Sequence, residues 1–316
     1  MNDFKKLNYI DRRQLSIEQL VKYYAEYRIY CYNKKDELKG IELRKKMHFL
    51  INLILETDRK LSKEENIIIA NDNKASKTEP KIFACTHIGG NDIQRTFQVI
   101  KEPAYLMLGD PGILYRKLIY QGLKLNGVIP LETKNKQDRK VAYNRSLELL
   151  KKGGNLLIYP EGAWNVSPNE LVMKTFVGTV RMAKEAGVPI VPIAVEQYEN
   201  KFLFNIGQNY GINKNTNKTE KELNIELRDK LATLKWQILE TQLMLKRKDV
   251  PNDYLFDFQD QIIQKCNYGY GFSLEDALSE RFHDKNIVSE DEVYKFMKHL
   301  DINKNNAFLL RNKPKI

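Results

Sequence analysis

The stretch KIFACTHIGGND, residues 81–92, predicts a short apolar strand, a turn with two glycines and the start of a helix. Open α/β sheets place their chemistry where such strands end. Histidine is the best general base near neutral pH, and a carboxylate bonded to its second ring nitrogen fixes its tautomer. The stretch therefore predicts a catalytic pair, with His87 as the base and Asp92 as the residue that orients it. The pair alone leaves a second interpretation open, a surface histidine in front of an N-capping aspartate.

Short apolar runs alternate with helical patterns on both sides of this stretch. This alternation predicts an α/β fold with a mostly parallel sheet flanked by helices. Pro192 removes a ladder donor, so we expect its strand to lie at the rim of the sheet. The expected strands are 82–85, 104–108, 128–131, 155–159, 190–195 and 202–206. The expected helices are 92–99, 113–125, 136–152 and 173–186.

Helical segments are predicted on either side of this α/β region. The N-terminal segment carries tyrosines and basic residues beside an apolar stripe. That composition suits helices at a lipid headgroup layer, and packing on the main domain is the alternative. We expect three parts, an N-terminal helical and membrane-interfacial segment (1–62), an α/β domain (63–210) and a C-terminal helical extension (211–316). The expected helices in the two flanking parts are 15–33, 37–61, 221–246, 254–266, 273–283 and 290–300.

The composition restricts the partners and the compartment. The 316 residues hold 52 Lys and Arg against 41 Asp and Glu, a net charge of +11, which favours an anionic partner such as nucleic acid, a phosphorylated substrate or a membrane. The sequence shows no nucleic-acid-binding motif, so we expect no nucleic acid partner. Three cysteines and four histidines form no metal-binding pattern, so we expect no metal. No apolar run reaches the ~18–20 residues of a membrane span, and the start lacks the apolar core of a signal peptide.

Four ordered blocks of the α/β region resemble the glycerolipid acyltransferase family, the group of lysophosphatidic acid acyltransferases. That family carries His-x-x-x-x-Asp, a Gly-x-Ile-Phe-like block, Phe-Pro-Glu-Gly-Thr-Arg and a Val-Pro-Ile-x-Pro-like strand. The corresponding blocks here are HIGGND (87–92), GVIPLET (127–133), YPEGAW (159–164) and VPIVP (188–192). The resemblance covers residues 80–210 and leaves the helical flanks unexplained.

The resemblance implies an O-acyltransferase that works by direct transfer. His87 would take the proton of an acceptor hydroxyl, which would attack the thioester of acyl-CoA or acyl carrier protein, with no other cofactor. Backbone N–H groups at a helix N-terminus could stabilise the oxyanion. The candidate oxyanion donors are Gly89, Gly90 and Asn91. The candidate substrate-binding residues are Glu161, Gly162, Gly127, Thr133, Trp164, Lys134 and Arg139.

Two departures from the family pattern bear on the acceptor. Thr133 and Trp164 stand where the family has arginines, the expected ligands of an acceptor phosphate. Lys134, Lys136 or Arg139 could substitute from the neighbouring loop. The alternative is a changed acceptor, because the flat apolar face of Trp164 suits a sugar ring or an acyl chain better than a phosphate.

We therefore expect phospholipid biosynthesis with 1-acylglycerol-3-phosphate or a related lysolipid as acceptor. The alternatives are the same chemistry on a glycolipid or glycan precursor, and an inactive lipid-binding homologue. The positive charge and the N-terminal helices suggest a cytoplasmic protein that lies peripherally on the anionic inner face of the cell membrane.

Overall fold

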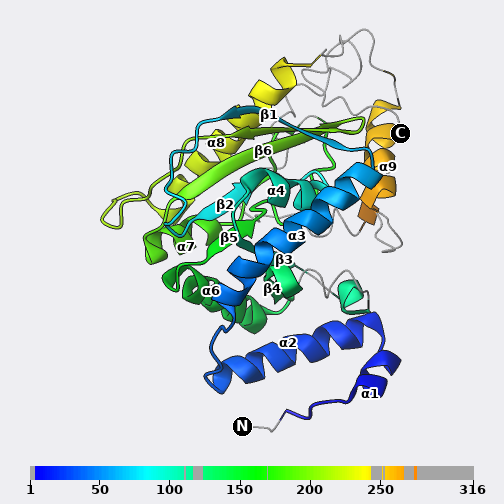
Figure 1. Cartoon of the computed structure of the whole chain (residues 1–316), viewed down its shortest axis with the longest axis vertical. Coiled ribbons are helices and arrows are strands. Elements are labelled where there is room, and N and C mark those ends of the chain that lie inside the picture. The colour runs from blue at the N-terminus through cyan, green and yellow to red at the C-terminus, as the bar shows by residue number, and fades with distance from the viewer. Residues whose placement is uncertain are drawn as a thin grey trace, which may run out of the picture.

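A seven-stranded sheet forms the centre of the protein (Figure 1). The computed structural model describes residues 4–109, 112–116, 124–168, 170–242, 251, 253–266 and 274–275. The strand order is β1-β7-β6-β2-β5-β3-β4, in which β6 and β7 pair antiparallel and the other neighbours pair parallel. The strands are β1 (Glu65–Asn71), β2 (Ile82–Cys85), β3 (Ala104–Gly109), β4 (Val128–Leu131), β5 (Asn155–Ile158), β6 (Ile190–Tyr198) and β7 (Lys201–Ile206).

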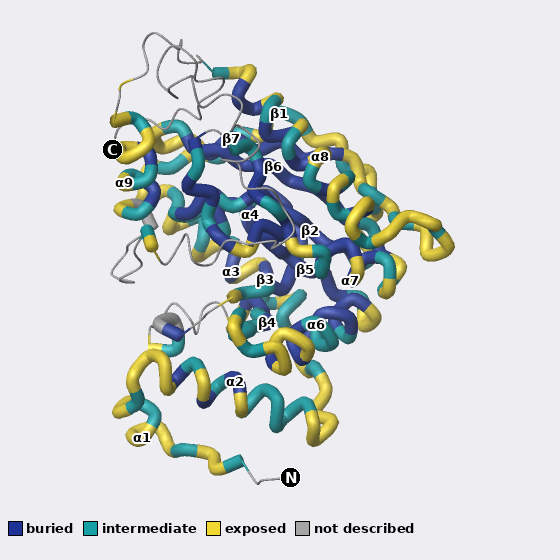
Figure 2. The backbone as a smooth tube through the Cα atoms, turned by 180° about the vertical axis from the view of Figure 1, so that it is seen from behind, coloured by how far each residue is buried: buried dark blue, intermediate teal, exposed yellow. Residues whose placement is uncertain are grey.

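Apolar cores cover both faces of this sheet. Its central strands are accordingly buried along most of their length (Figure 2). Successive side chains of a strand point to opposite faces, so Ile82 and Ala84 of β2 enter one core while Phe83 and Cys85 enter the other. The first core joins the sheet to α6, α7 and α8, and the second joins it to α4. These helices are α4 (Asp92–Ile100), α6 (Lys136–Lys151), α7 (Gly178–Ala186) and α8 (Glu220–Glu240). The predicted α/β fold with a mostly parallel sheet flanked by helices is confirmed.

The helical flanks pack on this centre at separate places. The N-terminal helices are α1 (Tyr9–Gln14), α2 (Ile17–Asn33) and α3 (Ile41–Leu61), and the last described helix is α9 (Tyr254–Cys266). Helix α2 lies apart from the sheet, against α6 (Figure 1), where Arg28 forms a bidentate ion pair with the buried Asp138. Helix α3 lies on α4. No helix among the described residues combines the length and the apolar character that a membrane span requires.

Several element predictions were wrong. Strand β1 was missed, although it pairs with β7 along its whole length. The strand that carries Pro192 lies inside the sheet between β7 and β2. It tolerates the proline because its ladder with β7 begins only at Ile193, and the Pro192 carbonyl accepts a hydrogen bond from the Gly207 N–H. Helix α1 was also missed.

Two predicted helices differ in extent. The helix expected over 173–186 begins only at Gly178, because the N–H groups of Met173 and Phe176 bond to Glu161 and to the Pro160 carbonyl instead. The helix expected over 113–125 is described only at its ends, as a 3-10 turn over Gly112–Arg116 and as helical residues 124–126. Of the helices expected at 273–283 and 290–300, only residues 274–275 are described, and they are helical.

Candidate active site

The turn that joins β2 to α4 brings the predicted pair together; we call residues 87–92 the His–Asp turn. Gly89 and Gly90 have φ angles of +82° and +65°, in the left-handed region that glycine enters without steric cost. These two residues fold the chain back on itself. Asp92, the first residue of α4, therefore points at the ring of His87, with 2.8 Å between Oδ2 and Nδ1.

The Asp92 carboxylate is buried and held by three donors. Its Oδ2 accepts the Nδ1–H of His87, the N–H of Ile88 at 2.8 Å and the N–H of Gly89 at 2.9 Å. An ionised carboxylate can only accept hydrogen bonds, so the ring hydrogen of His87 belongs on Nδ1. The Nε2 atom then carries the lone pair that a general base needs.

Aromatic rings hold the imidazole of His87 in place. Its ring lies against that of Tyr159, with centroids 4.3 Å apart, and forms a T-shaped pair with that of Trp164, with centroids 6.4 Å apart. The Tyr159 hydroxyl is buried and bonds to Thr96 Oγ1. Burial raises the pKa of Tyr159 well above its ordinary value, so this phenol stays neutral. Tyr159 therefore contributes packing and orientation to the site.

Glu161 lies beside His87 as a fully engaged, buried carboxylate. Its Oε1 accepts the N–H of His87 and its Oε2 accepts the N–H of Met173, each at 2.8 Å. Burial raises the pKa of the Glu161 carboxyl. Gly162 has a φ of +71°, and a Cβ there would come within 2.4 Å of the Phe176 ring. Glu161 thus fixes the backbone of His87 and of Met173. The substrate-binding role expected for both residues stays a prediction.

The three oxyanion candidates occupy different positions. The Gly89 N–H is taken by Asp92, which corrects its assignment as an oxyanion donor. Gly90 and Asn91 follow it in the same turn, directly before α4. The side chain of Asn91 donates to Glu64, so it is already engaged.

The remaining predicted substrate residues lie around β4, which β5 and β3 separate from β2. Gly127 stands at the amino end of β4, at the opposite edge of the sheet from His87. Its φ of +103° and the 2.8 Å that would separate an added Cβ from the Tyr105 ring account for the glycine, and its substrate role stays a prediction. Thr133 and Lys134 follow the carboxyl end of β4, and Arg139 donates to the Thr133 carbonyl.

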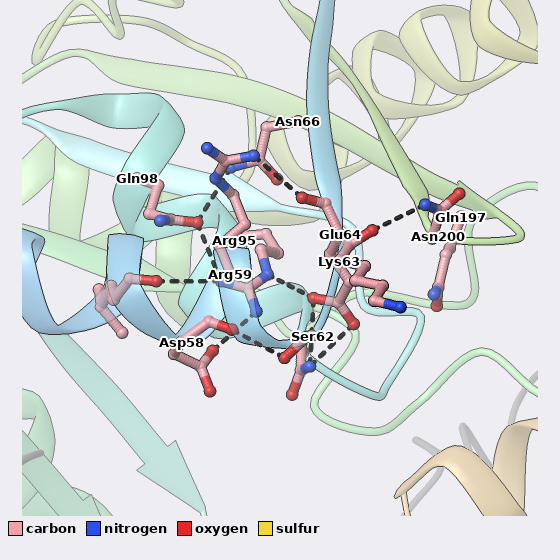
Figure 3. Close-up of polar contacts among 12 residues, drawn as sticks. Asp58, Arg59, Ser62, Lys63, Glu64, Asn66, Arg95, Gln98, Gln197 and Asn200 are labelled. Carbon is pink, nitrogen blue, oxygen red and sulfur yellow. Dashed lines mark hydrogen bonds and ion pairs between the residues drawn. The ribbon is translucent and has the colours of Figure 1, made fainter.

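Two features of the site were missed in the sequence. Glu64 and Arg95 form a polar network (Figure 3), and Glu64 links this network to the His–Asp turn through Asn91. Arg95 follows Asn91 by one helical turn, and this spacing is the signal that could have revealed it. The second feature is a small apolar cluster in which α9 packs on Trp164. Its buried members are Val166, Phe258 and Ile262.

Comparisons with known proteins agree with this architecture. Residues 66–196 match the Acyltransferase family. The chloroplastic 1-acyl-sn-glycerol-3-phosphate acyltransferase BAT2 of Brassica napus is 26% identical over 116 residues, which are 37% of this chain and 33% of that protein. The chain thus spans about a third of the length of this curated relative. The crystal structure of the 1-acyl-sn-glycerophosphate (LPA) acyltransferase PlsC from Thermotoga maritima has a similar fold, with a TM-score of 0.51 at 14% identity over 70% of this chain and 89% of that chain.

Proposed function

Because this chain belongs to the glycerolipid acyltransferase family, we propose that it moves a fatty acyl group from a thioester donor to an acceptor hydroxyl. The donor would be acyl-CoA or acyl carrier protein. The observation that carries the proposal is the buried contact between His87 Nδ1 and Asp92 Oδ2, which leaves Nε2 as the proton acceptor. A base in this arrangement contributes about 10²–10⁴-fold to a rate.

The proposed reaction uses the pair in two proton transfers. His87 Nε2 takes the hydroxyl proton while the acceptor oxygen bonds to the thioester carbonyl carbon. The tetrahedral intermediate then collapses, the C–S bond breaks, and the imidazolium returns the proton to the leaving thiolate. Asp92 stabilises the imidazolium between these steps. Backbone N–H groups at the N-terminus of α4 would stabilise the oxyanion.

A 1-acylglycerol-3-phosphate or a related lysolipid is the first candidate acceptor. Both named relatives act on this class of molecule, by their own names. Lys134 and Arg139 follow the carboxyl end of β4, at the same edge of the parallel sheet as His87. They are the cations from which a phosphate site would be built, since Thr133 carries no charge.

An acceptor without a phosphate, such as a glycolipid or glycan precursor, is the second candidate. The observation that favours it is Trp164, whose indole meets the ring of His87 where the family has a cation. The indole also packs on the cluster that contains Phe258 and Ile262, so it is held as a wall of the site. The intact His87–Asp92 pair argues against an inactive lipid-binding homologue.

We further propose that the protein works peripherally on an anionic membrane, the inner face of the cell membrane. Helix α3 presents a row of exposed apolar side chains beside basic ones, the pattern of a helix that lies in a headgroup layer. Phe49 is 79% exposed and Ile54 57%. The other exposed apolar residues of α3 are Leu43, Leu50, Leu53 and Leu61.

The substitution His87→Ala tests the proposed chemistry. We expect kcat to fall by at least about 10²-fold, because the proton acceptor is lost, while the thermal unfolding temperature stays close to that of the wild type. Release of free thiol from acyl-CoA, measured with lysolipid and with glycan acceptors, reports the activity and ranks the two candidate acceptors. Undiminished transfer by a purified His87→Ala protein contradicts the proposal.

A further inference from the structure

Glu64, in the loop between α3 and β1, contacts the His–Asp turn through its side chain. Asn91 Nδ2 lies 2.9 Å from Oε1 and 3.2 Å from Oε2 of Glu64. Arg95 Nε lies 2.6 Å from Oε2. Both partners belong to the start of α4, and Asn91 directly precedes Asp92. The Glu64 carboxylate therefore binds two side chains that lie one helical turn apart, one on each side of Asp92 in the sequence.

Arg95 extends this contact to α3. Its guanidinium is fully buried and pairs with Asp58 at 2.7 Å as well as with Glu64 (Figure 3). It also bonds to Gln98 and to the Leu55 carbonyl. A buried cation is tolerated when its charge and its donors are matched in this way. The end of α3, the loop before β1 and the start of α4 are thus joined by a single charged network.

The position of Asp92 depends on this network. Its Oδ2 must reach three donors at once, and such a contact tolerates displacements of only about 0.5 Å. The residue before it, Asn91, is fixed by Glu64, and the residue three positions after it, Arg95, is fixed by Glu64 and α3. We propose that Glu64 is a positioning residue for the acyl transfer reaction, which orients Asp92, and through it His87, by means of Asn91 and Arg95. This inference rests on the proposed function.

The contact between positions 64 and 91 can be broken and rebuilt. Asn91→Asp places a second carboxylate against Glu64, and the repulsion should displace the start of α4. A displacement near 1 Å lowers a rate by about 10²-fold. We expect kcat to fall by about that factor with little change in KM for either substrate. Glu64→Gln alone keeps a side chain that can bond to Asn91 but removes a charge that pairs with Arg95, so we expect a smaller fall of kcat, which serves as the reference for the double variant.

The double variant Asn91→Asp with Glu64→Gln decides the matter. The amide at position 64 can donate to the new carboxylate and still accept from Arg95, so kcat should return to that of Glu64→Gln alone. A purely structural role predicts that Asn91→Asp lowers stability and leaves the kcat of the folded protein unchanged, so kcat is measured at a temperature at which every variant is folded. Glu102→Gln is the matched control: Glu102 is a buried carboxylate paired with Lys81 at the amino edge of the sheet, and its loss should lower stability without changing kcat.

A second readout separates this inference from the proposed function. The hydrogen on His87 Nδ1 should give a low-field proton resonance, assigned by its loss in His87→Ala. We expect it to shift in Asn91→Asp and to return in the double variant, whether or not the protein transfers acyl groups. The inference is overturned if Asn91→Asp leaves both kcat and this resonance unchanged, or if Glu64→Gln fails to restore them.

Discussion

Asp92 closes the His–Asp turn and orients the base with the same oxygen atom. Its Oδ2 accepts two backbone N–H groups, from Ile88 and Gly89, as well as the ring hydrogen of His87. These N–H groups lie just before a helix, where no intrahelical carbonyl would satisfy them. Asp92 stands five positions after His87 because the turn between them is tight. Two glycines with positive φ allow a turn of this length to bring the two side chains together.

Asp92→Asn should separate these two roles. The amide oxygen can still accept both backbone N–H groups, so we expect the fold and the melting temperature to persist. The loss of the negative charge removes the support of the imidazolium, and in a serine protease the equivalent change lowers kcat about 10⁴-fold. We therefore expect a fall of kcat of about 10³–10⁴-fold with KM changed little, measured by steady-state kinetics. Activity within twofold of the wild type would contradict the role given to Asp92.

Some residues of the candidate site could be predicted from the sequence, and others could not. The meeting of His87 and Asp92 followed from the strand-turn-helix pattern and the two glycines. The burial of Glu161 did not, because a carboxylate in a Pro-Glu-Gly turn gives no local sign that two backbone amides will surround it. Glu64 was missed because it lies 27 positions before Asn91 in the sequence. Only the folded structure shows that the two side chains are in contact.

At the scale of elements, α9 depends on a small cluster of its own. Phe258 and Ile262 bury against Val166 and Trp164, apart from the two large cores of the sheet. Removing a core phenylalanine costs about 3–5 kcal/mol. Because the cluster is separate, we expect that loss to act on α9 alone and not on the whole fold.

Phe258→Ala should therefore release α9 from Trp164. We expect amides of α9 to exchange hydrogen at least tenfold faster and KM for the acceptor to rise, while global unfolding by urea changes little. Phe256→Ala is the matched control on the same helix, since Phe256 is 73% exposed and is not a buried member of this cluster. Equal protection of α9 in both variants would show that Phe258 does not hold it.

The local sequence pattern was sufficient to predict most strands of the sheet, but not all of them. Five runs of apolar residues gave strands at nearly the predicted limits. Strand β1 was missed because it directly follows α3 and only its pairing with β7, more than 100 residues later, defines it. The position of Pro192 depends likewise on where a neighbouring strand ends, which no feature of its own segment reveals.

At the scale of the whole molecule, charge and apolar surface are arranged together. The net charge of +11 is not concentrated in one motif, and the apolar side chains of α3 are exposed next to basic residues. Helix α3 is also linked to the His–Asp turn, because Asp58 pairs with Arg95, and Arg95 shares Glu64 with Asn91. A surface that draws the protein onto an anionic bilayer would therefore place the site near its lipid acceptor.

Binding to vesicles tests this arrangement. We expect sedimentation with phosphatidylglycerol vesicles that weakens as salt rises, and little binding to phosphatidylcholine vesicles. Phe49→Ser with Ile54→Ser removes apolar burial worth about 1.5–3 kcal/mol per side chain, so affinity should fall at least tenfold. Ile225→Ser is the control, because Ile225 is 49% exposed on α8, which covers the other face of the sheet from α4 and α3. An equal loss in the control, or none in the α3 variant, would show that α3 is not the surface that meets the membrane.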